Sequence, residues 1–148
     1  MTRLQTLEAI ENARVAHLEQ MQKIEALIEG RSVRKLTAVD KSECEFGRWF
    51  FGESDTLKRL LGAQLYKSID AIHEYWHLEY EKIYDIFMNE SDGSMVSKLL
   101  GFYHIPKKRM DEVLFYYKEL QITSEDLLKA LESSKRRVLA LKESKFVA

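Results

Sequence analysis

The strongest constraint on the fold is a run of apolar and small residues spaced three and four apart through the last third of the chain. It extends over residues 110–141, about four heptads, and the same spacing recurs over residues 7–28 and 66–87. This is the period of an α-helix, and each such helix needs another apolar face to cover it. No segment shows the alternation typical of a half-buried strand. We therefore predict an all-α protein.

Start and stop residues place the ends of the expected helices. The first helix should end at Gly30, and Ser42 followed by Glu45 has the spacing of a capping box that would begin a short helix. Residues 52–55 indicate a turn, and Pro106 lies where the first turn of a helix tolerates proline. The expected helices are residues 3–29, a short one from Ser42 to about 51, 66 to about 88, 95–103, and 107–143, the last of which could break at 123–124.

From this pattern we expect one domain over residues 1–148, an antiparallel four-helix bundle with an additional short helix that carries Cys44. A chain of 148 residues can bury a core without disulfides. The helix over residues 107–143 would be roughly 50 Å long, longer than the others, so part of it could pack on a second copy. A bundle helix with a frayed, charged end explains the same spacing. Our expectation is a homodimer.

Composition narrows the location and the partners. A single cysteine excludes an internal disulfide and fits a reducing compartment, and no apolar stretch is long enough to cross a bilayer, so we expect a cytoplasmic protein. The 23 basic and 24 acidic residues give a net charge of −1, so neither nucleic acid nor a membrane is an expected partner. The basic runs at 107–109 and 135–137 fit a solvated face, with contact to an acidic partner as the alternative.

One stretch of the second long helix contains residues that bind metals. His73-Glu74-Tyr75-Trp76-His77 fits the H-E-x-x-H pattern of zinc proteases. Two histidines four apart lie on one face of a helix and suit any metal task, so the five residues alone do not decide the function. A tetrahedral zinc needs further ligands. The remaining histidines and cysteine are His17, Cys44 and His104.

His17 and Cys44 are the stronger of these candidates. His17 falls on the apolar face of the first helix, where an unpartnered polar ring would be costly to bury. Cys44 comes two residues after the expected N-cap, where the helix N-terminus favours the thiolate that binds metal. Taken alone, a hydrogen-bonded core histidine and a small buried cysteine are the alternatives. We interpret His104, two residues before Pro106, as a surface or capping residue.

Read together, these motifs resemble the chemoreceptor zinc-binding (CZB) domain of bacterial signalling proteins. That family has a histidine on its first helix, a Cys-x-hydrophobe-Gly-x-aromatic motif and a His-x-x-x-His pair. Here these motifs correspond to His17, to Cys44-Glu45-Phe46-Gly47-Arg48-Trp49 and to His73 with His77. They lie within residues 17–77. One departure is Gln20, where the family usually has an aromatic or large apolar residue.

The resemblance implies a helical bundle, often dimeric, that binds zinc and passes metal or oxidant status to an output module such as a chemoreceptor or a diguanylate cyclase. Four protein ligands leave no position for an activated water, which favours a sensor over an enzyme. A thiolate among imidazoles also offers a switch, because its oxidation removes one ligand. The implied zinc ligands are His17, Cys44, His73 and His77.

Two other classes fit parts of the same pattern. A zinc peptidase would use Glu74 as general base, but the chain lacks the glycine and the third histidine that extend the H-E-x-x-H motif in one large group of such enzymes. A hemerythrin-like di-iron bundle would carry oxygen with about five histidines, and this chain has four. Glu74 is more simply interpreted as an exposed helix residue.

Overall fold

The structure, a computed structural model, describes residues 1–147, and these are mostly helical. No strand forms in that part of the chain, where the one bridge joins Asp92 and His104. The all-α prediction is therefore confirmed. The three long helices are α1 (Arg3–Ile28), α4 (Ala63–Glu90) and α6 (Lys107–Ala140). The short ones are α2 (Glu45–Gly52), α3 (Ser54–Leu61), α5 (Met95–Leu99) and a 3-10 turn at Glu143–Lys145.

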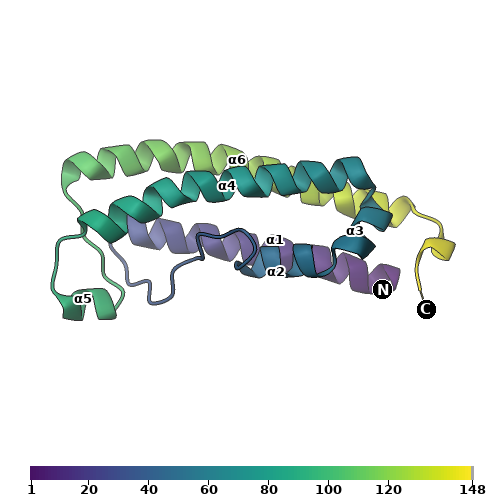
Figure 1. Cartoon of the computed structure of the whole chain (residues 1–148), viewed down its shortest axis with the longest axis horizontal. Coiled ribbons are helices and arrows are strands. Elements are labelled where there is room, and N and C mark those ends of the chain that lie inside the picture. The colour runs from purple at the N-terminus through teal and green to yellow at the C-terminus, as the bar shows by residue number, and fades with distance from the viewer. Residues whose placement is uncertain (148) are drawn as a thin grey trace.

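The long helices lie side by side, with α1 and α4 running in one direction and α6 in the other (Figure 1). The α6 helix packs against both α4 and α1. On the opposite side, α2 packs against α1 and α3 packs against α4. Residues 31–61 thus take the fourth position around the core, where a bundle of four long helices would have its fourth member. The four-helix arrangement we expected is not confirmed, since the described residues contain three long helices.

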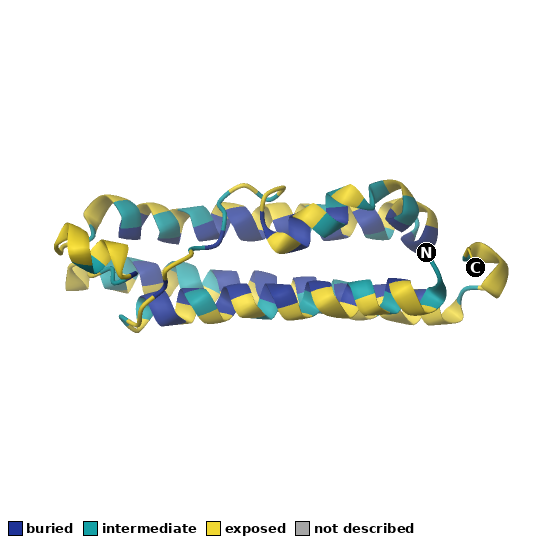
Figure 2. Ribbon diagram, turned by 90° about the horizontal axis from the view of Figure 1, so that it is seen from below, coloured by how far each residue is buried: buried dark blue, intermediate teal, exposed yellow. Residues whose placement is uncertain are grey.

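The buried residues form two apolar clusters that follow one another along the helices, on the surfaces where the rows of helices face each other (Figure 2). One cluster contains Phe46, Phe50 and Leu57 from the short helices, and the other contains Trp76, Tyr80 and Phe87 from α4. Between the clusters lies a layer of buried polar side chains. Burying such groups is unfavourable unless they find partners. The layer contains His17, Gln20, His73, His77 and Ser124.

The predicted boundaries held for the long helices better than for the short ones. The cap is Cys44, whose sulfur accepts the Gly47 N–H, so the prediction of Ser42 as N-cap was wrong. Ser42 instead donates its backbone N–H and its hydroxyl to the Asp40 carboxylate. The α3 helix begins within the turn expected at residues 52–55, in a stretch where no helix was predicted. The predicted helix over 95–103 ends at Leu99.

The α6 helix continues unbroken through residues 123–124 and ends at Ala140. Its apolar stripe, which we expected to pack partly on a second copy, is covered within the chain. Val113, Leu120, Leu127 and Val138 are each 0% exposed. Most of the stripe is therefore used within the chain, and the homodimer stays a prediction. No described helix is both long and apolar enough to cross a membrane.

Candidate metal centre

His73 and His77 lie one turn apart on the buried face of α4, within the polar layer. Their rings are 4.7 Å apart between centroids and nearly perpendicular, at 89°. The helix is anchored on both sides of the pair, because Ile69 packs in one apolar cluster and Trp76 in the other. The positions of the two imidazoles are thus fixed by a long, well-packed helix.

Cys44 brings a sulfur to the same place from the opposite side of the core. Its Sγ lies 3.3 Å from Nε2 of His73. Zinc bond lengths to sulfur and nitrogen with tetrahedral angles require a separation of about 3.5 Å between two such ligand atoms. One ligand atom from each of Cys44, His73 and His77 lies within 4.8 Å of the other two. These three residues therefore form a buried group suited to a metal ion.

Gly47 explains how Cys44 reaches this position. A Cβ atom placed on Gly47 would lie 1.7 Å from the carbonyl oxygen of Lys41, so only glycine allows α2 to approach the loop backbone this closely. The Gly47 N–H donates to Cys44 Sγ at 3.2 Å. The close approach that Gly47 permits is thus between α2 and the loop at Lys41.

The two histidines of α4 carry buried nitrogens that fit a metal. His77 Nδ1 lies 2.8 Å from the Val39 carbonyl oxygen, to which it donates, so the neutral ring keeps its lone pair on Nε2. His77 Nε2 has no hydrogen-bond partner, and neither does Nδ1 of His73. A carbonyl that accepts from one ring nitrogen and leaves the other free is the usual arrangement around a metal-binding histidine.

Burial keeps the three imidazoles neutral. It lowers the pKa of His73 to about 3 and that of His17 to about 4, and the proximity of His77 further disfavours a charge on either ring. Burial also lowers the pKa of His77, while the bond to Val39 opposes the shift. Neutral imidazole is the form that binds metal. At neutral pH these rings need to lose no proton before they ligate.

Cys44 behaves differently from our expectation. Burial raises the pKa of its thiol, and hydrogen bonds from Gly47 and Gln20 only partly offset that increase. In the metal-free chain desolvation thus outweighs the effect of the helix end, and the thiolate expected for Cys44 beside zinc stays a prediction. Gln20, the departure from the family pattern, is buried, and its side chain acts to lower the pKa of Cys44.

His17 lies in the same layer but outside the group of three. It is 1% exposed, its ring contacts Trp76 edge-on at 5.3 Å, and its Nε2 is 2.6 Å from Ser124 Oγ. Its role as a fourth ligand stays a prediction. Sequence reasoning missed Ser124, which looked like one more small residue of the helical stripe, and Val39, which contributes through its backbone.

The other candidate residues lie outside the group. The Glu74 side chain is 59% exposed, and one of its oxygens is 3.7 Å from Lys41 Nζ. His104 is exposed and lies in the connection between α5 and α6. The α5 helix is at the far end of the molecule from the chain termini (Figure 1). Among residues 1–147, Cys44, His73 and His77 form the one cluster of potential metal ligands.

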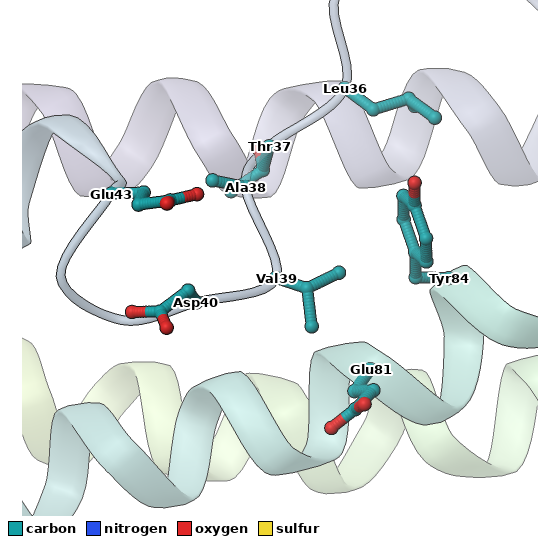
Figure 3. Close-up of a pocket in the computed structure, with 8 residues that line it drawn as sticks. All are labelled: Leu36, Thr37, Ala38, Val39, Asp40, Glu43, Glu81 and Tyr84. Atoms are coloured by element: carbon teal, nitrogen blue, oxygen red, sulfur yellow. The ribbon is translucent and has the colours of Figure 1, made fainter.

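The loop over residues 36–43 separates this group from solvent. A pocket of about 630 Å³ lies between the loop and α4, with Asp40, Glu43 and Glu81 among its lining side chains (Figure 3). A second hollow of about 230 Å³ reaches His77 beside Glu74 and Glu81. The loop backbone at Val39 therefore lies between His77 and solvent, with hollows next to it.

The geometry defines an all-helical protein with a buried cysteine and histidine group that fits a metal. Residues 17–84 match the family model of the chemoreceptor zinc-binding domain, CZB. The match begins at His17 and includes every predicted ligand, which confirms the resemblance; it covers just under half of the chain and leaves all of α6 outside. The comparisons found no match among curated proteins or solved structures.

Proposed function

We propose that this chain is a zinc-binding sensor domain that reports zinc or oxidant status to a signalling partner. The observation that carries the proposal is the buried group of Cys44, His73 and His77, whose ligand atoms lie within 4.8 Å of one another. One ring nitrogen of each histidine in this group has no hydrogen-bond partner. His17 is the proposed fourth ligand, because it lies in the same buried layer and at the start of the matched segment.

A site with one thiolate and three imidazoles suits sensing. When bound, zinc would supply the positive charge that stabilises Cys44 as a thiolate. Val39 orients His77, Gly47 holds the Cys44 sulfur, and the surrounding apolar clusters exclude water. With four protein ligands no coordination position remains for a catalytic water, so we propose a role other than catalysis.

The cysteine also offers a route to oxidant sensing. A groove of about 450 Å³ between α1 and the loop is lined by Gln20, Cys44 and Arg48. An oxidant such as hypochlorous acid would transfer its hydroxyl to the thiolate, giving the sulfenic acid while its chlorine leaves as chloride. That product has lost the anionic sulfur. Chelator competition before and after stoichiometric oxidant tests this role, and unchanged affinity would leave Cys44 as a structural ligand only.

The central test is metal content. Purified wild-type protein should contain about one zinc per chain, and a variant with His73→Ala and His77→Ala should contain almost none, because two of four ligands are gone. His104→Ala is the matched control, since that histidine is exposed and distant from the group. Equal zinc in the wild type and the double variant would remove the basis of the proposal.

We further propose that the protein works as a homodimer in contact with a chemoreceptor or diguanylate cyclase. Because the apolar stripe of α6 is covered within the chain, a dimer would use other side chains, such as the exposed Tyr75 of α4 and Phe115 and Ile122 of α6. Light scattering should then give about twice 17.4 kDa. A mass of one chain at micromolar concentration would contradict the dimer.

A further inference from the structure

Ser124 has an unusual hydrogen bond for a serine in the middle of a helix. Its hydroxyl is buried, and within the described residues His17 Nε2, at 2.6 Å, is its one side-chain partner. Thr123 and Ser134 on the same helix instead donate to carbonyls one turn back, at 3.2 and 2.9 Å. Ser124 therefore bonds to a side chain of α1 and not to a carbonyl of its own helix.

The direction of this bond follows from the groups available. A buried hydroxyl proton needs an acceptor, and leaving it without one is costly. A neutral imidazole carries one N–H and one lone pair. The Ser124 hydroxyl thus donates to the lone pair on His17 Nε2, which leaves the ring proton on Nδ1. The lone pair that could bind a metal is then already occupied.

This arrangement accounts for the place of His17 outside the group of three. We propose that Ser124 competes with the metal ion for His17 Nε2, and that this competition couples α6 to the metal state of the site. The inference rests on the proposed function, in which His17 is the fourth ligand. When His17 turns toward Cys44, the Ser124 hydroxyl is released and can donate to the Leu120 carbonyl, as Thr123 and Ser134 do with theirs.

The consequence is a specific role for α6. This helix lies wholly outside the segment that matches the family, so the family motifs do not assign it a function. The bond between Ser124 and His17 is a buried polar link between α6 and α1, located between the two apolar clusters. Losing that link on metal binding changes the packing of α6 at its middle, which makes α6 the helix that carries the signal outward.

The test is zinc affinity in two matched variants, measured by competition with a chelator. Ser124→Ala removes the competing hydroxyl and should bind zinc about three- to tenfold more tightly, the effect of one hydrogen bond. Ser134→Ala, also buried on α6 but bonded to its own helix, should stay within about twofold of wild type. In a His17→Ala background, Ser124→Ala should change the affinity no further, because the pair acts as a unit.

A second measurement needs no metal. Nitrogen NMR of the metal-free protein should show His17 with its proton on Nδ1, and a proton on Nε2 would overturn the proposal. So would unchanged or weaker zinc binding by Ser124→Ala, since a hydroxyl that supports the ligand would have that effect. If wild type and Ser134→Ala bind no zinc at all, the proposed function fails as well. If both bind and Ser124→Ala binds no more tightly, only this inference fails.

Discussion

The two walls of the metal centre are built in different ways. His73 and His77 stand on α4, a helix of 28 residues whose neighbouring side chains pack in both apolar clusters. Cys44 stands at the start of α2, a helix of 8 residues that follows an irregular segment. One wall is held by extensive apolar packing. The other is held by Phe46 and Phe50, which α2 buries in one apolar cluster, and by a small number of polar contacts from the loop that precedes it.

Those contacts can be named. The Val39 carbonyl accepts from His77, the Thr37 carbonyl accepts from Tyr80 at 2.8 Å, and Lys41 pairs with Asp70 at 2.9 Å. Opening α4 would expose many core side chains, whereas opening the loop would break these bonds, the contact at Gly47 and the partial packing of Leu36 and Val39. The difference teaches that the histidines are preorganised by a long packed helix, and that the loop over residues 36–43 is the less extensively packed part of the site.

The largest effect should come from breaking the cysteine wall at its tightest contact. Gly47→Ala places a Cβ 1.7 Å from the Lys41 carbonyl oxygen, and neither backbone can yield without moving Cys44. We expect a loss of about 3 kcal/mol or more in the free energy of unfolding and weaker zinc binding. Denaturant unfolding and chelator competition measure the two effects.

The same helix supplies the control for that prediction. A Cβ at Gly52 would meet no atom within 4 Å, so Gly52→Ala should change stability by no more than about 1 kcal/mol, in the stabilising direction expected for alanine in a helix. Equal stabilities for the two variants would mean that the loop is loosely held, and the contrast between the walls would lose its main support.

The second prediction compares the two walls by the protons that zinc binding must displace from them. The pKa of Cys44 is raised by burial, so below that pKa metal binding must displace its proton, while the imidazoles, with lowered pKa values, are already neutral. Zinc affinity should therefore rise with pH, about tenfold per unit between pH 7 and 8, as expected for release of one proton. Chelator competition at several pH values measures the slope.

Cys44→Ala is the variant that isolates this effect. It should bind zinc more weakly, and its affinity should vary little over the same pH interval, because no thiol proton remains to be displaced. A slope in the variant as steep as in the wild type would assign the proton to the histidine wall instead.

Sequence reasoning found most of the rigid wall and less of the cysteine wall. Apolar periodicity located the three long helices and the spacing of His73 and His77, because both depend only on neighbours along one helix. The position of Cys44 as N-cap depends on the approach of α2 to Lys41, a contact between backbones that no local pattern encodes. Ser42 had the residue types of a capping box, but Asp40 takes its hydroxyl.

Two contacts in the polar layer could not be predicted from the sequence, for a related reason. Ser124 occupies a position of the α6 stripe where a small residue fits the helical period, and its bond to His17 exists only once α1 and α6 are packed together. Gln20 was noticed as a departure from the family, but its contact with Cys44 needs the fold of the intervening chain. The α3 helix, with 8 residues, is too short for periodicity to detect.

The smallest effect should come from the outer face of the rigid wall. Glu74 is the residue a zinc peptidase would need as general base, yet its side chain is 59% exposed and contacts Lys41 only at 3.7 Å. Asp70 holds the same lysine at a shorter distance, so Glu74→Gln should cost less than about 1 kcal/mol of stability. Zinc content should not change, since Glu74 is absent from the group of ligands. Metal analysis and a peptide-cleavage assay of both proteins provide the check. Zinc-dependent hydrolysis that this one substitution abolishes would show an open coordination position in the centre and restore the peptidase alternative.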